Sequence, residues 1–340
     1  MKVRLEPSDE YMHPGPEPTF NESMYFNLFD PAVGLGGFVR LGNRPNEGHA
    51  EMTVCLYLPE RPMAFMFQRP EIADNERFDA GGASFEVVTP FEEIKVAYEG
   101  KVVLLDEPID MADPRRAFTE NPYGTATVDL TYRGVSRPFG GEPEESHERP
   151  GEEFAKGHYE QLVRAEGTIR VDDRSWEVDG FGLRDHSWGP RTWQAPWYYR
   201  WLTMNFPDGT GMMLSRIARP DGPGTRGGFL WDGEGLHVVR DVHLETDWTE
   251  GDRYHSTVRA TFTTARDGND DGIAGAVTGE VLDLIPLRNR RDGRITRISE
   301  GMTRWTLDRA LGADPTATVG HGLSEYLDQI VDGAPVGIDE

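Results

Sequence analysis

The feature that most constrains the fold of this chain is an alternation of apolar and polar side chains with a period of two residues. Clear examples cover residues 50–58, 124–132 and 254–264. Successive side chains of a β-strand point to opposite faces, so each run predicts a strand with one buried face. Such runs recur from residue 36 to residue 307 and favour an all-β protein.

Turn-forming sequences separate the predicted strands. Residues 42–48 and 59–62 are rich in Gly, Asn and Pro, and residues 98–101, 171–175 and 231–235 have the composition of hairpin links. Many short strands with this punctuation predict β-barrels or strongly curved sandwiches.

Helical periodicity is rare in the chain. Only residues 20–29 and 323–330 have apolar residues at helical spacing, so we expect few short helices. There is no strand–helix alternation and no Gly-rich phosphate loop, so nucleotide-cofactor chemistry has no support.

The 340 residues are enough for roughly two domains. We expect an irregular, Pro-rich arm at residues 1–19 and a first β domain at residues 20–140. A charged stretch rich in Gly and Pro at residues 141–155 predicts a linker or mobile loop. Residues 156–340 would form the second β domain, which carries the central segment described below.

Composition excludes several classes of protein. The net charge of −24 argues against nucleic acids and anionic membrane surfaces as partners. No apolar run approaches the roughly 18 residues of a membrane span, and the N-terminus lacks the apolar region of a signal peptide. A cytoplasmic location follows by default. The single cysteine, Cys55, lies in an alternating apolar run, which predicts a buried thiol.

One central segment, residues 181–201, is unusually rich in aromatic and ionisable side chains. Four of the 8 Trp residues fall in it, and they are Trp188, Trp193, Trp197 and Trp201. The segment also contains one acid, one imidazole and three guanidinium groups. Aromatic faces beside ionisable groups suit a site for an apolar, partly unsaturated ligand.

Asp185 is the candidate general acid of this segment. A carboxyl group among indoles loses hydration, which raises its pKa and keeps it protonated near neutral pH. Such an acid can protonate an alkene, an epoxide or a hydroxyl group. A capping or ion-pair role with Arg184 or Arg191 is the structural alternative, and for His186 the alternative is a hydrogen-bonded structural imidazole.

His158 and Glu160 form a second candidate cluster because side chains two residues apart share one face of a strand. They would form a proton relay with Asp185, or equally a surface hydrogen-bond network. Together with Asp185 and His186 they are also the best metal ligands that the sequence offers, but no two His have tight ligand spacing within one element, so we expect no metal. An acidic Gly-containing stretch at residues 266–272 lacks the later acid of a calcium loop.

Residues 197–206 read as a strand with two different faces. Trp197, Tyr199 and Trp201 share the face that suits the lining of a ligand cavity, whereas Tyr198 lies on the more apolar face that suits a core. Packing of both faces between sheets is the alternative.

Residues 180–191, Gly-Phe-Gly-Leu-Arg-Asp-His-Ser-Trp-Gly-Pro-Arg, carry a family resemblance. Asp185-His-Ser-Trp-Gly189 resembles the Asp-His-Glu-Trp-Gly segment of the AttH-like and CrtC-like (carotenoid hydratase, hydroxyneurosporene synthase) superfamily, in a branch of mostly unknown function. The resemblance implies two consecutive lipocalin-like β-barrel domains and chemistry on apolar substrates, with Asp185 at the position of the acid that protonates a double bond. Ser187 stands where the family has Glu, which removes one acid.

Two functional hypotheses follow. The first is a cofactor-independent acid–base enzyme, a hydratase or dehydratase, isomerase or cyclase, acting on a terpenoid- or polyketide-like molecule, with Asp185, His186 and His158 as catalytic residues. The second is a carrier or sensor of an apolar metabolite without chemistry. In both, the same residues would bind the ligand: Trp188, Arg191, Trp197, Tyr198, Tyr199, Trp201 and Glu160. Exposed strand edges would also allow a homodimer.

Overall fold

A computed structural model describes residues 3–60, 62–144, 155–220, 222–251, 253–265, 272–309 and 318–338. The chain divides into two compact units, Met1–Thr192 and Trp193–Glu340. Both units consist mainly of antiparallel β-strands, which confirms the all-β prediction. The helices of the described residues are short: α1 (Pro114–Glu120) and the 3-10 turns η1 (Pro7–Glu10), η2 (Pro45–Glu47) and η3 (Pro108–Ala112). None of these helices is long and apolar enough to cross a membrane.

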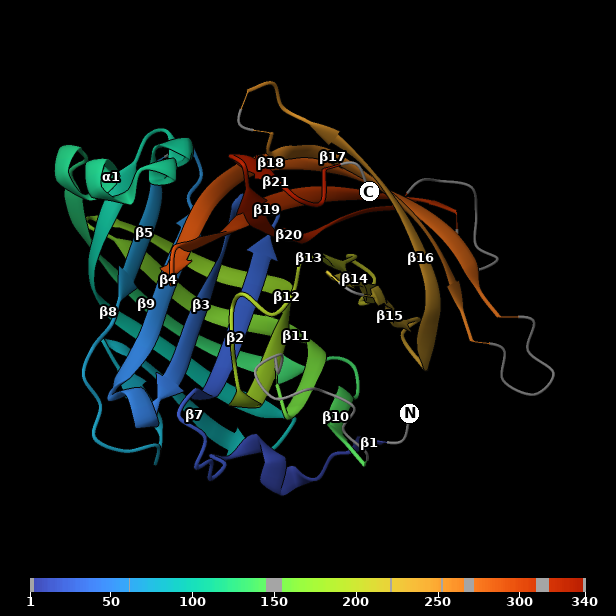
Figure 1. Cartoon of the computed structure of the whole chain (residues 1–340), viewed down its shortest axis with the longest axis horizontal. Helices are drawn as coiled ribbons and strands as arrows, with labels where there is room; N and C mark the ends of the chain where they lie inside the picture. The colour runs from blue at the N-terminus through green and yellow to red at the C-terminus, as the bar shows by residue number, and fades with distance from the viewer. Residues whose placement is uncertain are drawn as a thin grey trace. The chain divides into compact units, whose positions relative to one another are not determined.

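Eight strands of the first unit close into a barrel (Figure 1). Each strand pairs antiparallel with the next, and β12 returns to β2 to complete the ring. In ring order the strands are β2 (Phe20–Asp30), β3 (Leu35–Arg44), β4 (His49–Tyr57), β5 (Met63–Gln68), β8 (Glu93–Leu105), β9 (Tyr123–Gly134), β11 (Gly157–Val171) and β12 (Arg174–Pro190). Ring closure leaves these strands without a free edge along most of their length.

Four shorter strands extend this ring. The hairpin of β6 (Phe78–Ala80) and β7 (Ala83–Thr89) adds to β8, whereas β10 (Phe139–Pro143) pairs with the start of β11 and β1 (Val3–Arg4) pairs with β10. These strands supply the edges of the first sheet.

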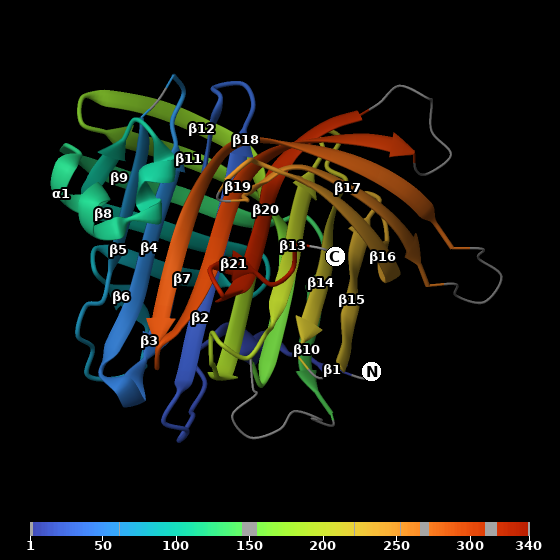
Figure 2. The same cartoon turned by 45° about the horizontal axis from the view of Figure 1, so that its top comes forward.

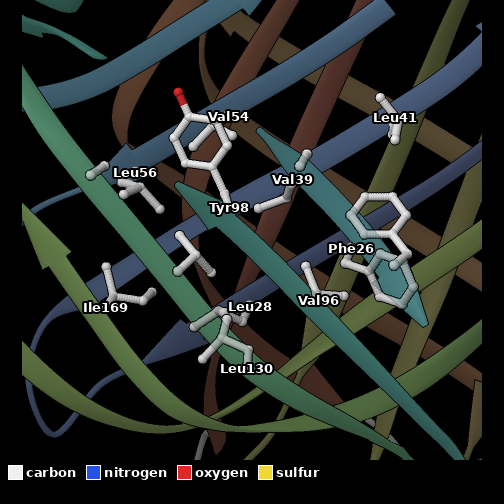
Figure 3. Packing of buried hydrophobic residues seen from close by; sticks show 14 of the residues in the cluster. Phe26, Leu28, Val39, Leu41, Val54, Leu56, Val96, Tyr98, Leu130 and Ile169 are labelled. Carbon is white, nitrogen blue, oxygen red and sulfur yellow. The ribbon is translucent and has the colours of Figure 1, made fainter. Parts of the chain in front are cut away.

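The interior of the first barrel is filled with side chains from alternate positions of its strands. Phe26 and Leu28 of β2 point inward with Val39 of β3 and Val54 of β4 (Figure 3). Val96, Tyr98, Leu130 and Ile169 meet them from the other strands in the same view. The alternation that predicted the strands therefore marks the buried face, which we call the inner face; the opposite side of each strand is the outer face.

The strands of the second unit form a simple up-and-down ring (Figure 2). Each strand pairs with its successor, and β20 pairs back with β13. They are β13 (Tyr198–Asn205), β14 (Gly211–Arg219), β15 (Gly222–Trp231), β16 (Leu236–Trp248), β17 (His255–Thr264), β18 (Ala274–Arg291), β19 (Arg294–Arg309) and β20 (Thr318–Val331), with β21 (Ala334–Pro335) beside β20. Leu202, Met204 and Trp305 lie in its core.

The expected domain boundary at residues 141–155 needs correction. Residues 145–154 lie outside the described part of the chain, but β11 and β12, which follow them, belong to the first unit. β11 pairs with β9 and β12 with β2, so these ladders close the first barrel. The boundary falls between Thr192 and Trp193. The central segment is therefore divided between the units and is not carried by the second one alone.

Three local predictions were wrong for a common reason. Residues 20–29 and 323–330 form strands β2 and β20, and residues 98–101 continue β8 without a turn. In each case long-range strand pairing overrides a weak local signal. The hairpin links at 171–175 and 231–235 are confirmed, and Cys55 is buried as predicted. Most of the acidic stretch at 266–272 lies outside the described residues.

Candidate functional site

The pairing of β11 with β12 separates the candidate residues into two sets. Glu160 lies opposite Asp185, and Tyr159 lies opposite His186. Because side chains alternate along each strand, His158, Glu160 and Asp185 share the outer face. His186 and Trp188 point to the inner face with the core of the barrel. The sequence had allowed one metal site formed by all four residues, but His186 points away from the other three and cannot join them.

On the outer face, His158 Nε2 lies 3.6 Å from a carboxylate oxygen of Glu160. The Glu160 side chain is buried and Asp185 is partly buried. One register step further, Ser187 exchanges a hydrogen bond of 3.0 Å with Ser23. These contacts place two carboxyl groups and one imidazole together on one stretch of sheet.

Arg191 continues this outer-face group at the end of β12. It is buried and donates a hydrogen bond of 2.8 Å to the hydroxyl of Ser187. The backbone N–H of Arg191 also donates to Thr19, the residue before β2. Gly189 has a φ of 116°, a backbone conformation that favours glycine and lets the chain leave the strand here.

On the inner face, Glu22 of β2 lies between two imidazoles. Its Oε1 atom is 2.6 Å from His186 Nε2 and 2.9 Å from His13 Nδ1. Glu22 and His186 are fully buried, and the His13 side chain is 15% exposed. Burial alone would raise the pKa of Glu22, but hydrogen bonds from His13 and His186 bring it below its ordinary value.

A second buried carboxylate, Glu10, adjoins this group. Two nitrogen atoms of Arg184 donate to its two oxygens at 2.6 and 2.8 Å, and the Tyr159 hydroxyl donates at 2.5 Å. Burial would raise the pKa of Glu10, but the Arg184 guanidinium lowers it below its usual range. Tyr159 also lies 3.4 Å from His186 Nδ1, so the two carboxylate groups are linked through one chain of contacts. Burial holds the pKa of Tyr159 well above its ordinary value.

The N-terminal arm supplies two members of this inner cluster, which sequence reasoning did not identify. Glu10 ends the 3-10 turn η1, and His13 follows it in the irregular segment before β2. One signal for a buried partner was available in the sequence. Glu22 stands two and four residues before Met24 and Phe26, which face the core, so an extended chain puts Glu22 on the same face. A carboxylate in such a register needs a buried partner.

Trp188 packs inside the first barrel. Its ring stacks on His13 with centroids 4.0 Å apart and an interplanar angle of 4°, and it belongs to a small core cluster with Phe20 and Tyr159. It is 1% exposed. The contacts of this indole are thus with the arm and the inner cluster.

The other predicted aromatic residues belong to the second unit: Tyr198, Tyr199 and Trp201 lie in β13, and Trp197 directly precedes it. Tyr198 lies on the same face as Arg200, whose guanidinium forms an ion pair of 3.0 Å with Asp328. On the opposite face, Tyr199 donates a hydrogen bond to Glu325. Trp197 and Trp201 are partly buried.

Three solved structures are similar to this chain over most of its length. Kievitone hydratase from Nectria haematococca has a TM-score of 0.61 at 11% identity, covering 96% of this chain and 93% of that one. A putative AttH from Nitrosomonas europaea has a TM-score of 0.57 at 15% identity, covering 98% of each chain. The protein CghA has a TM-score of 0.56 at 13% identity, covering 92% and 88%.

At these identities the likeness concerns the fold, and it confirms the AttH-like, two-barrel architecture that the central motif predicted. No curated protein matches the sequence. The sequence profile of one family, described as a domain of unknown function (DUF7064), matches residues 6–330. The chain therefore belongs to the DUF7064 family.

Proposed function

We propose that this protein is an acid–base enzyme of the hydratase, dehydratase, isomerase or cyclase type that acts on an apolar, unsaturated small molecule. The observation that carries the proposal is the outer face of the β11–β12 hairpin. There His158, Glu160 and Asp185 lie within one register step of each other. This arrangement brings a general acid, a general base and an imidazole to one place.

The opposed carboxyl groups are suited to divided roles. Side chains directly opposite on antiparallel strands have Cβ atoms about 5 Å apart. Such a distance lets two carboxyl groups act on the same bound substrate. One of them donates a proton while the other accepts one.

Hydration of a carbon–carbon double bond balances with these groups alone. The protonated carboxyl transfers its proton to one alkene carbon and leaves a cation on the other. Water adds to that cation, and the second base takes the proton that water loses. Returning this proton to the first carboxylate restores the starting state, so the step consumes only water. Proton loss from a neighbouring carbon of the same cation would give isomerisation instead.

The comparisons support this choice of reaction class without identifying the substrate. One structural neighbour is named as a hydratase of kievitone. A terpenoid- or polyketide-like substrate is the corresponding proposal here, and no cofactor is required because the steps are proton transfers and addition of water.

The test uses the full-length chain with a panel of apolar polyenes, prenylated aromatics and polyketide-like alkenes. Products are followed by chromatography with mass detection, where hydration adds one water. Asp185→Asn and Glu160→Gln preserve side-chain shape while removing one acid, and we expect each to reduce turnover about 100-fold or more. The matched control is Asp179→Asn, a carboxylate elsewhere on β12 that pairs with Arg164.

Ligand affinity measured alongside turnover separates the two functional hypotheses. Turnover lost in Asp185→Asn and Glu160→Gln with affinity kept supports the enzyme. Full turnover in both variants contradicts the proposed acid–base pair. Tight binding of a panel member without turnover, unchanged in Asp185→Asn, contradicts the enzyme and favours the carrier.

A further inference from the structure

We propose that His13, Glu22 and His186 form a binding site for a divalent transition-metal ion at one end of the first barrel. The site lies on the inner face of β2 and β12 and does not depend on the function proposed for the outer face. The sequence had led us to expect no metal. Of the metal ligands considered there, only His186 belongs to this site.

The three candidate ligand atoms already lie together. One nitrogen of each imidazole and one oxygen of Glu22 are within 4.8 Å of one another. The two nitrogen–oxygen distances are 2.6 and 2.9 Å. Ligands of a tetrahedral zinc ion, at about 2.1 Å from the metal, are separated by about 3.4 Å. The nitrogen–oxygen distances therefore need to lengthen by about 0.5 to 0.8 Å.

Each ligand is oriented by a second contact, as outer-shell partners orient the ligands of metal sites. The backbone N–H of His13 donates to Glu22 Oε2 at 2.8 Å, which turns Oε1 toward the imidazoles. The Tyr159 hydroxyl lies 3.4 Å from His186 Nδ1, which leaves Nε2 to face Glu22. The ring of His13 is held by stacking on Trp188.

The charges of the buried groups favour a divalent cation. Among the described residues that these contacts join, the buried carboxylates are Asp9, Glu10 and Glu22, whereas the buried guanidinium is Arg184. Three buried carboxyl groups thus face one buried guanidinium, which favours an added positive charge. Arg4 approaches Asp9 at 3.6 Å but is half exposed, so water screens its contribution.

Two imidazoles and one carboxylate select the class of ion. This ligand set suits Zn²⁺, Fe²⁺, Co²⁺ and neighbouring ions, whereas Ca²⁺ and Mg²⁺ prefer oxygen ligands. Three protein ligands leave at least one coordination position for water or another small ligand. The partial exposure of His13 provides the side from which an ion enters.

Such an ion would fasten the N-terminal arm to the barrel. His13 lies in the arm, Glu22 in β2 and His186 in β12, so coordination links segments far apart in the sequence. Binding would therefore slow hydrogen exchange of residues 9–22 as well as fill the site.

The test titrates Zn²⁺ alone into full-length protein that carries no histidine tag and has been treated with a chelator. We expect calorimetry to show one ion per chain with micromolar or tighter affinity. Co²⁺ should give the visible absorption bands of a site with nitrogen and oxygen ligands, and either ion should protect residues 9–22 from exchange. Tyr159→Phe, which removes the outer-shell contact to His186 and also a hydrogen bond to Glu10, should weaken binding about 10- to 100-fold.

Two ligand variants and one control decide the assignment. His13 lies outside the barrel strands, so we expect the His13→Gln protein to fold. His13→Gln and Glu22→Gln should each weaken metal binding about 100-fold or more. His243→Gln is the control, because His243 is an exposed imidazole 3.8 Å from Glu245 in the second unit; it should bind as the unchanged chain does. The proposal is overturned if the unchanged chain shows no saturable binding, or if His13→Gln binds equally well. The cluster would then be held by hydrogen bonds alone.

Discussion

Replacing Glu10 with Gln should destabilise the first barrel more than any exposed charge substitution on the β11–β12 hairpin, which supplies its partners Arg184 and Tyr159. Glu10 accepts hydrogen bonds from two nitrogens of Arg184, from the Tyr159 hydroxyl and from the backbone N–H of Phe91 at 2.7 Å. A glutamine offers one acceptor oxygen, and its amide group would face N–H donors. The Arg184 guanidinium would remain buried without its counter-charge.

The magnitude follows from that burial. Removing one partner of a buried ion pair costs about 3–5 kcal/mol, because the other charge is left uncompensated. With a denaturant slope of about 2 kcal/mol per molar urea, the midpoint for Glu10→Gln should fall by about 2 M. Urea denaturation followed by tryptophan fluorescence measures this loss, and hydrogen exchange of β12 assigns it to the first unit.

Asp179→Asn is the matched control for this experiment. Asp179 accepts two hydrogen bonds from Arg164 at 2.7 and 2.6 Å in the same β11–β12 hairpin, but both side chains are about half exposed. An exposed pair contributes about 1 kcal/mol or less. A double variant, Glu10→Gln with Arg184→Met, should recover part of the loss because no unpaired charge remains. Equal losses for Glu10→Gln and Asp179→Asn would refute the argument that burial makes the inner pair strong.

Two further predictions concern stability. Burial, with Arg200 and Arg297 nearby, lowers the pKa of His255 to about 3, so the unfolded chain takes up a proton below pH 6.5 that the folded chain refuses. The contribution of His255 to the unfolding free energy is therefore complete above pH 6.5 and falls by about 1.4 kcal/mol per pH unit between 6.5 and 3. His255→Asn should flatten this part of a plot of unfolding free energy against pH. An unchanged slope would contradict the prediction. A Cβ added at Gly182 would lie 1.8 Å from the carbonyl oxygen of Asn27, so Gly182→Ala should cost about 2 kcal/mol or more by strand displacement, whereas Gly235→Ala, with its nearest neighbour at 3.6 Å, should change the thermal midpoint little.

The sequence alone was sufficient to predict how individual strands form. Alternation at positions such as 126, 128 and 130 marks side chains that share one face, and the structure places them in the core of the first barrel. The same rule separates Asp185 from His186, because neighbours on an extended chain point to opposite faces. These properties depend on neighbours in the chain, so a local pattern encodes them.

Pairing between distant strands was decided only by the tertiary structure. The hydrogen bonds that join β12 to β2 place the central motif in the first unit and turn residues 20–29 into a strand. Contacts between Glu10 and Arg184, 174 residues apart, draw the N-terminal arm into the barrel end. No local pattern records such partners, since a buried carboxylate requires a counter-charge but does not specify from which segment it comes.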